Sequence, residues 1–354
     1  GYASEWYNST YHPLWATPVS VNAPTDTTNI NFTLEPGGTI SGRVYQSDNT
    51  TPIAGATVDV WDHASLAGKW ISFGGVETGA DGSYKSLGLP TGKYGVRVRA
   101  TGYATELYNN TYYKDTATPV SVTVPGDTAG INFVLGPGGS ISGRILRSDN
   151  VTPIADCRVN AYDNTTKQWM TNVYTGAQGN YTIPGLPNGS YLVRAHPSYT
   201  HLNYVDKYYS NIYWQSQATP VSVTVPNDTP DINFTLDVGG TISGRVLCSD
   251  NVTPIINCRV YASDNATKQY MTDTYTDYQG NYTIAGLPAG SCLVRAQPSY
   301  TGLNYVNEYY NNVYWQDQAT PVPVTVPNDT PNINFVLEAA GKPDLIISEK
   351  HEAW

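Results

Sequence analysis

The chain has 354 residues, of which only 14% are charged, and its formal net charge is −10. This acidic balance argues against nucleic-acid binding, which needs clustered lysine and arginine, and no apolar run is long enough to span a membrane. The 32 glycines and 24 prolines are spread along the chain, a pattern typical of many short strands joined by turns.

Residues 1–36 are expected to supply only two strands, Thr17–Asn22 and Asn29–Leu34, because apolar and polar residues alternate there. Two strands alone cannot bury an apolar face, and they leave open edges. We therefore expect this partial unit to be completed by a strand from a neighbouring copy. The alternative is that the chain is a fragment of a larger precursor.

From residue 37 onward one unit repeats with a step of 101 residues. The sequence Gly-Gly-Thr/Ser-Ile-Ser-Gly-Arg-Val/Ile begins at Gly37, Gly138 and Gly239, and an Asn-Phe pair recurs with the same step. A period this long is a whole domain rather than one turn of a solenoid. The expected organisation is a partial repeat at 1–36, full repeats at 37–137, 138–238 and 239–339, and a tail at 340–354.

The expected strands are clearest in repeat 3. Seven stretches with alternating apolar residues are separated by turns such as Gln279–Gly280. They predict an all-β protein of tandem Greek-key β-sandwich domains, transthyretin-like or immunoglobulin-like, with antiparallel strands and in a linear array. The stretches are 242–248, 258–262, 270–275, 282–284, 292–296, 322–326 and 333–337.

Four motifs of repeat 3 carry a family resemblance: the Gly-Thr-Ile-Ser-Gly-Arg-Val opening, Thr253–Ile255, Gly280–Ile284 and Gly286–Pro288. Together they resemble the carboxypeptidase regulatory-like family, over roughly residues 37–339. The resemblance implies a transthyretin-like β-sandwich of the kind repeated in surface proteins. The resemblance does not imply the enzyme activity in the family's name, because in the family this domain accompanies the catalytic one. Related surface domains form a Lys–Asn isopeptide bond, which is not expected here because strand one contains no lysine.

The tail contains Pro343–Asp344–Leu345–Ile346–Ile347, which resembles the opening strand of a CARDB-type adhesion domain over about a dozen residues. Leu345–Ile347 has no counterpart in the repeat. It is therefore our candidate for the strand that completes the partial unit of another copy.

An aromatic cluster precedes an Ala-Thr-Pro sequence in the partial unit and in every repeat. Such rings can pack a sandwich edge, anchor a protein interface or stack on sugars, and the sequence leaves all three open. The candidate interface aromatics are Trp6, Tyr7, Tyr108, Tyr113, Tyr209, Trp214, Tyr310 and Trp315.

The chain has four cysteines. Cys248 ends the first expected strand of repeat 3 and Cys258 begins the second, so a hairpin would bring them within disulfide range. We predict that pair, which leaves Cys157 and Cys292 as unpaired or intermolecular thiols. The alternative is four buried free thiols.

The sequence contains fourteen Asn-X-Ser/Thr sequons. They favour a glycan-coated secreted surface, although the high content of asparagine and threonine is an alternative explanation. The candidate glycosylation sites are Asn8, Asn31, Asn49, Asn109, Asn150, Asn164, Asn180, Asn188, Asn227, Asn233, Asn251, Asn265, Asn281 and Asn328.

No catalytic, cofactor-binding or metal-ligating set is recognisable. The five histidines form no His-Glu-x-x-His pair, and no Gly-x-Ser-x-Gly elbow occurs. Turns such as Asp149–Asn150 lack the spacing of an EF-hand. We therefore expect no enzyme activity and no cofactor, with structural calcium in these turns as an alternative.

The sequence thus predicts an extracellular structural protein that self-associates, a subunit of a cell-surface filament, stalk or wall layer. Head-to-tail association by strand complementation is the expected mode. The alternative is a carbohydrate-binding or adhesion array from a larger secreted protein, with glycans as partners.

Overall fold

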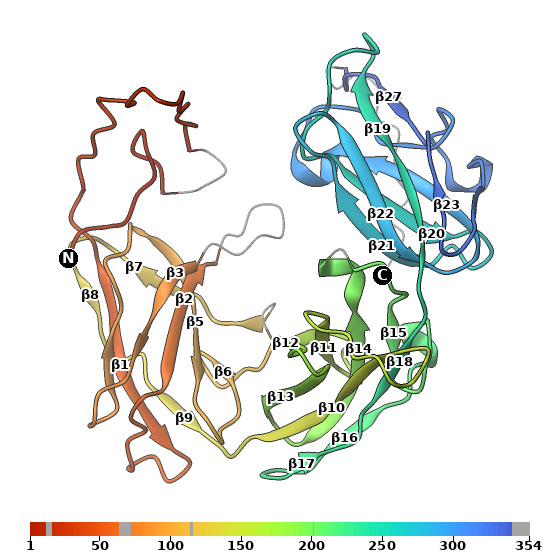
Figure 1. Ribbon diagram of the computed structural model, residues 1–354. Coiled ribbons are helices and arrows are strands. Elements are labelled where there is room, and N and C mark those ends of the chain that lie inside the picture. Colours follow the sequence, from red (N-terminus) through yellow and green to blue (C-terminus); the bar gives the residue numbers. More distant parts are fainter. Residues whose placement is uncertain (12–15, 64–71, 114–115, 201, 342–354) are drawn as a thin grey trace.

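The computed structural model describes residues 1–11, 16–63, 72–113, 116–200 and 202–341. It contains three units of nine strands each, β1–β9, β10–β18 and β19–β27 (Figure 1). The prediction of an all-β protein built from repeated sandwiches is confirmed. We call the three units repeats 1, 2 and 3.

The strands of the three repeats correspond one to one. Repeat 1 contains β1 (Thr39–Gln46), β2 (Thr57–Asp62), β3 (Ser72–Glu77), β4 (Ser83–Lys85), β5 (Gly92–Arg99), β6 (Glu106–Leu107), β7 (Val120–Val122), β8 (Asp127–Thr128) and β9 (Phe133–Leu135). Repeat 2 contains β10 (Gly139–Arg147), β11 (Arg158–Asp163), β12 (Trp169–Tyr174), β13 (Asn180–Leu186), β14 (Gly189–His196), β15 (Lys207–Tyr208), β16 (Val221–Val223), β17 (Asp228–Thr229) and β18 (Phe234–Leu236). Repeat 3 contains β19 (Gly240–Cys248), β20 (Arg259–Asp264), β21 (Tyr270–Tyr275), β22 (Asn281–Leu287), β23 (Gly290–Gln297), β24 (Glu308–Tyr309), β25 (Val322–Val324), β26 (Asp329–Thr330) and β27 (Phe335–Leu337). Short 3-10 turns are η4 (Pro197–Thr200), η5 (Gln215–Gln217), η6 (Pro298–Thr301) and η7 (Gln316–Gln318).

Each repeat consists of two facing sheets. In repeat 1, β1 pairs with β4 on one side and with β8 and β9 on the other, while β2 lies between β3 and β5, and β5 also pairs with β6 and β7. The prediction that all strands are antiparallel is wrong, because β8 and β9 run parallel to β1. After β7 the chain crosses to the other sheet, so its last strands follow β1 in the same direction.

The opening motif of each repeat has a direct structural reason. Ile40 is fully buried, and the flanking hydroxyls of Thr39 and Ser41 donate hydrogen bonds to the Asp127 carboxylate at 2.5 and 2.6 Å. A Cβ on Gly42 would lie 2.0 Å from the carbonyl oxygen of Ile131. Only glycine therefore allows the last strands to pack against β1. The same hydroxyl–carboxylate contacts recur at Asp228 and Asp329.

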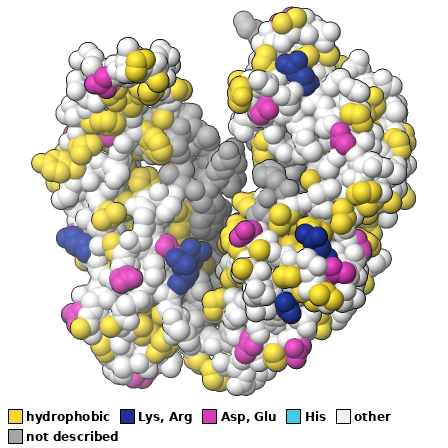
Figure 2. Space-filling view, viewed as in Figure 1, with side chains coloured by type: hydrophobic (Ala, Val, Ile, Leu, Met, Phe, Trp, Pro, Cys, Tyr) yellow, Lys and Arg dark blue, Asp and Glu magenta, His cyan; other side chains and the backbone are white. Residues whose placement is uncertain are grey.

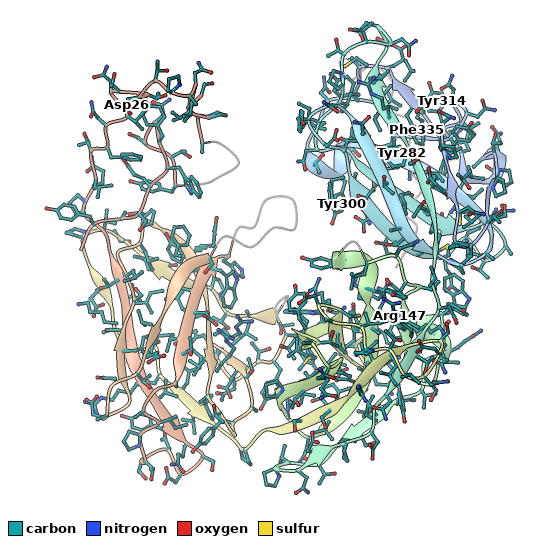
Figure 3. All side chains as sticks on the ribbon, viewed as in Figure 1. Asp26, Arg147, Tyr282, Tyr300, Tyr314 and Phe335 are labelled. Atoms are coloured by element: carbon teal, nitrogen blue, oxygen red, sulfur yellow. The ribbon has the colours of Figure 1, made fainter. Side chains whose placement is uncertain are left out.

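Each repeat has its own hydrophobic core. In repeat 3, Ile242 of β19 and Val260 of β20 are fully buried and belong to the same core, although they come from different sheets. Tyr282 and Phe335 close the core with ring centroids 6.2 Å apart (Figure 3). A fully buried side chain of this size contributes about 1.5–3 kcal/mol to folding, so each repeat holds enough apolar surface for a core of its own.

The partial unit lacks regular strands in its described residues. The predicted strands Thr17–Asn22 and Asn29–Leu34 are therefore wrong: this part of the chain forms no strand, and it projects beyond repeat 1 (dark red in Figure 1). In repeat 1 the corresponding strands β7 and β9 pair with β5 and β1. The described residues of the partial unit contain no strands equivalent to β5 and β1.

The repeats follow one another in chain order, and the row curves between them (Figure 1). Charged side chains lie scattered over the visible face (Figure 2), as the low charge content leads one to expect. No helix among the described residues is long and apolar enough to cross a membrane.

Candidate assembly surfaces at the junctions and ends

The same two segments meet wherever one unit follows another. A tyrosine of the preceding unit forms a β-bridge with the residue just before the next unit, as Tyr103 does with Pro137. Opposite this segment lies the Gly-Leu-Pro loop of the next unit. The bridge recurs at Tyr2–Pro36 and Tyr204–Val238, and also at the end of repeat 3, at Tyr305–Ala339.

Backbone packs directly on backbone at the first two junctions. A Cβ on Gly88 would lie 2.2 Å from the carbonyl oxygen of Tyr2. Between repeats 1 and 2, the Thr105 N–H donates to the carbonyl oxygen of Gly185 at 2.9 Å, and Gly185 has a φ of +72°. Glycine is required there both for the close approach and for the left-handed backbone.

The junction between repeats 2 and 3 is bridged by a side chain. Asn203 stands where repeat 1 has Gly102. Its Nδ2 donates to the carbonyl oxygen of Gly239 at 2.8 Å, and its Oδ1 accepts from the Gly286 N–H at 3.0 Å. The two repeats are therefore joined through the asparagine amide.

An ion pair of repeat 2 also reaches repeat 3. The Arg194 guanidinium donates to Asp206 Oδ2 at 2.6 Å and to the carbonyl oxygen of Met271 at 3.3 Å, and the Arg194 and Asp206 side chains are only 13% and 12% exposed. Burial acts against the charge on Arg194, but Asp206 more than compensates, so the arginine pKa is raised. Burial and the nearby Arg194 hold the pKa of His196 well below its ordinary value.

Four of the eight candidate interface aromatics pack inside their own unit. Each lies edge-on to a phenylalanine of that unit, with ring centroids 6.0–6.3 Å apart. This contact is the one that the sandwich-edge alternative predicts, and an interface role of these tyrosines stays a prediction. The pairs are Tyr7–Phe32, Tyr108–Phe133, Tyr209–Phe234 and Tyr310–Phe335.

The other four candidates lie at junctions or at chain ends. Tyr113 approaches Asp163 of repeat 2, and Trp214 lines a cleft shared with repeat 3. Trp315 occupies the same position in repeat 3 and is 49% exposed. Trp6 of the partial unit is 52% exposed.

Sequence reasoning missed a buried charged position. Glu106 and Glu308 are 4% and 3% exposed, and each has one carboxylate oxygen without a hydrogen-bond partner. Burial raises the pKa of both carboxyls to about 7. Repeat 2 has Lys207 instead, whose Nζ lies 2.8 Å from Asp237 Oδ2. The signal that could have revealed it was the recurrence of a charged residue within each aromatic cluster.

The cysteines do not form the predicted pair. All four are free thiols. Cys248 ends β19 in one sheet, whereas Cys258 precedes β20 in the other sheet, so no hairpin brings them together. Instead, Cys248 Sγ lies 3.2 Å from the Tyr305 hydroxyl, and burial raises the pKa of the Cys258 thiol to about 12. Cys157 and Cys292 are buried thiols as well.

The sequons and the acidic turns lie at the surface. None of the fourteen sequon asparagines is buried, and only Asn164, Asn265 and Asn281 are half-buried. The Asp149 carboxylate accepts hydrogen bonds from the backbone and hydroxyl of its own turn, which lower its pKa to about 2. Within the described ranges, no cluster of three His, Cys, Asp or Glu residues could hold a metal ion.

The carboxypeptidase regulatory-like domain model matches residues 39–136, 140–237 and 241–338, well over half of the chain. The chain belongs to this family. No curated protein matches it. The suggested CARDB-type onset lies outside the described residues and stays a prediction.

Several solved structures are distantly similar to this carboxypeptidase regulatory-like array. The Bacillus anthracis TIE protein is 14% identical over 87% of this chain and 52% of its own, with a TM-score of 0.25. The Streptococcal ancillary pilin is 11% identical over 86% and 99%, with a TM-score of 0.26. BcpA, the major pilin subunit of Bacillus cereus, is 11% identical over 85% and 99%, with a TM-score of 0.21. The chain thus spans about half of the TIE structure, and likenesses this distant carry no argument about function.

Proposed function

We propose that this chain is an extracellular, non-catalytic structural protein, the subunit of a cell-surface filament, stalk or wall layer, whose copies associate head to tail. One observation carries the proposal. Val21, Phe32 and Leu34 of the partial unit are 75%, 50% and 46% exposed, whereas the corresponding Val122, Phe133 and Leu135 are at most 1% exposed. A contiguous exposed apolar face of this kind marks an interaction surface.

Repeat 1 indicates what would cover this face. There Phe133–Leu135 pairs in parallel with Val44–Gln46. A strand donated by a neighbouring copy could take the same place beside Phe32–Leu34, with backbone hydrogen bonds providing affinity and apolar side chains filling the exposed face. Leu345–Ile347, outside the described residues, is the proposed donor. Because donor and acceptor lie at opposite ends of the sequence, repeated contacts of this kind build a filament.

The far end of the row offers a second surface. Tyr314 and Trp315 of repeat 3 are each 49% exposed, whereas Trp214 at the preceding junction is half-buried; Tyr314 lies at the outer edge of repeat 3 (Figure 3). Aromatic side chains at such a position are effective interface anchors. The surface positions of the sequons support an extracellular setting.

The alternative of a carbohydrate-binding array needs an equivalent exposed ring platform in every repeat. The aromatic clusters do not provide one, because Tyr112 and Tyr113 of repeat 1 are half-buried while Trp315 is exposed. We therefore do not propose a sugar site in each repeat.

Val21→Asp tests the proposed assembly. A carboxylate on the apolar face should block strand addition, so filaments seen by electron microscopy should disappear while the three repeats keep their circular dichroism spectrum. Val252→Asp is the matched control, since Val252 is 74% exposed in a turn. Removal of residues 341–354 should have the same effect as Val21→Asp. Normal filaments from Val21→Asp would refute the proposal, and normal filaments from the truncated chain alone would exclude the tail as donor.

A further inference from the structure

A cleft of about 650 Å³ lies between repeats 2 and 3 and is lined by residues of both. The corresponding junction between repeats 1 and 2 encloses only about 20 Å³. The larger volume is within the range of small-molecule binding sites. One junction of the chain therefore has room for a ligand where its counterpart has none.

The residue exchange described above accompanies this difference. Between repeats 1 and 2, Thr105 bonds directly to the backbone of Gly185. Between repeats 2 and 3, the side-chain amide of Asn203 instead bonds to two backbone groups of repeat 3, the carbonyl oxygen of Gly239 and the N–H of Gly286. Gly286 also lines the cleft, so the asparagine amide fastens one wall of the cleft to repeat 2.

Aromatic side chains form much of the cleft wall. Tyr162, Tyr208, Tyr213 and Trp214 come from repeat 2, and Tyr270 comes from repeat 3. The flat, electron-rich faces of such rings pack well against the C–H groups of sugar rings, while tyrosine hydroxyls and indole N–H groups remain able to hydrogen-bond. Gln215 and Gln269 add amide groups that can bond sugar hydroxyls.

The cleft carries a surplus of positive charge. Arg194 is neutralised by Asp206 at 2.6 Å, but Lys167 and Lys268 also line the cleft. Their ammonium groups bond to the neutral side-chain oxygens of Asn164 and Asn265, at 3.0 and 3.2 Å. Asp163 and Asp264 of the same two loops do not line the cleft; their carboxylates face their own turns, where they accept hydrogen bonds from the backbone and threonine hydroxyls.

We propose that this cleft binds a short acidic oligosaccharide, with its rings against the aromatic wall and its carboxylates near Lys167 and Lys268. Two positive groups in a protein of net charge −10 select an anionic ligand over a neutral one. The site is independent of the proposed filament, because neither the partial unit nor the exposed face of Trp315 takes part in it.

Calorimetric titration of the full chain tests the proposal. The probes are three acidic tetrasaccharides (tetragalacturonate, tetramannuronate and a hyaluronate tetramer), with neutral cellotetraose for comparison. At least one acidic probe should bind saturably, more weakly at high salt, and more tightly than cellotetraose. Trp214→Ala should weaken that binding about ten-fold or more, whereas Tyr113→Ala, at the closed junction, should leave it unchanged.

The double variant Lys167→Gln with Lys268→Gln changes only two exposed side chains, so both loops should keep their structure. It should remove the preference for the acidic probe. Absence of binding by all three acidic probes, or equal binding of cellotetraose, would overturn the proposal. Unchanged affinity in both the tryptophan and the lysine variants would overturn it as well. Filament formation is scored on the same variants and should be normal, which separates failure of this site from failure of the proposed assembly.

Discussion

Residues 17–34 and 118–135 have closely related sequences but different structures. In repeat 1 the segment forms β7 and β9, and Phe133 is 1% exposed. In the partial unit the same pattern of apolar residues forms no strand, and Phe32 is 50% exposed. Alternation of apolar and polar residues therefore marks a segment that is able to become a strand, and the strand forms only where a partner offers backbone groups and a core.

The largest expected effect comes from the same substitution in both segments. Phe133→Ala removes a fully buried ring from the core of repeat 1 and should lower its free energy of unfolding by about 3–5 kcal/mol. Phe32→Ala should leave the unfolding of all three repeats unchanged within about 0.5 kcal/mol. Denaturant unfolding followed by hydrogen exchange at repeat 1 measures both. Equal losses from the two variants would show that the partial unit is already packed.

A smaller effect is expected from making repeat 1 resemble the partial unit. Gly42→Ala would place a methyl group 2.0 Å from the carbonyl oxygen of Ile131 and so push β1 away from β8 and β9. We expect a loss of about 1–3 kcal/mol and faster amide exchange in Phe133–Leu135 than in the same segment of repeat 2. Gly136→Ala is the control, because a Cβ at that position meets nothing within 4 Å. Gly55→Ala is unsuitable, because Gly55 has a φ of +69° and alanine there would strain the backbone. Unchanged exchange in β9 would contradict the role assigned to this contact.

The smallest effect concerns pH. Burial raises the pKa of Glu106 from 4.5 to about 7 in the folded state. Between these two values the unfolded chain releases the proton and the folded chain retains it, so the stability of repeat 1 should fall as the pH rises from about 4.5 to 7 and then level off. We expect Glu106→Gln to remove this fall, stabilising repeat 1 by about 1–2 kcal/mol at pH 8 and by little at pH 4. Glu5→Gln in the partial unit, where Glu5 is half-buried, is the matched comparison; equal pH profiles for wild type and Glu106→Gln would exclude the carboxyl as the cause.

The repeat and its strands could be predicted because both are properties of local sequence. The strand expected at Tyr270–Tyr275 is present with those bounds, and the inward-facing Cys258, Val260 and Ala262 are fully buried. The parallel pairing of β9 with β1 was missed, since alternation of side chains is the same in parallel and antiparallel strands. The Cys248–Cys258 disulfide failed for a related reason: adjacency in sequence does not reveal that consecutive strands lie in different sheets.

The cleft was beyond sequence reasoning for another reason. Of its aromatic residues, Trp214 belongs to the cluster recognised in the sequence, and repeats 1 and 3 carry similar clusters, whereas Tyr162 and Tyr270 come from strands β11 and β21. What distinguishes this junction is a set of exchanges at equivalent positions, among them Asn203 for Gly102 and Trp214 for Tyr113, together with loops of two different repeats that approach only in the folded chain. A pattern that looks equivalent in every repeat cannot show which junction is open.

The parallel pairing of β1 with β9 determines how a repeat would respond to tension. The chain enters a repeat at the start of β1 and leaves it at the end of β9, and these two strands are hydrogen-bonded neighbours, with Val44 opposite Phe133 and Gln46 opposite Leu135. Since the strands are parallel, pulling the two ends apart slides one strand along the other and loads the pairing hydrogen bonds together rather than one at a time. In a row of such repeats, a pulling force acts on the short set of hydrogen bonds between these two strands in each unit. The rate at which those hydrogen bonds break together then sets how fast the unit unfolds under force.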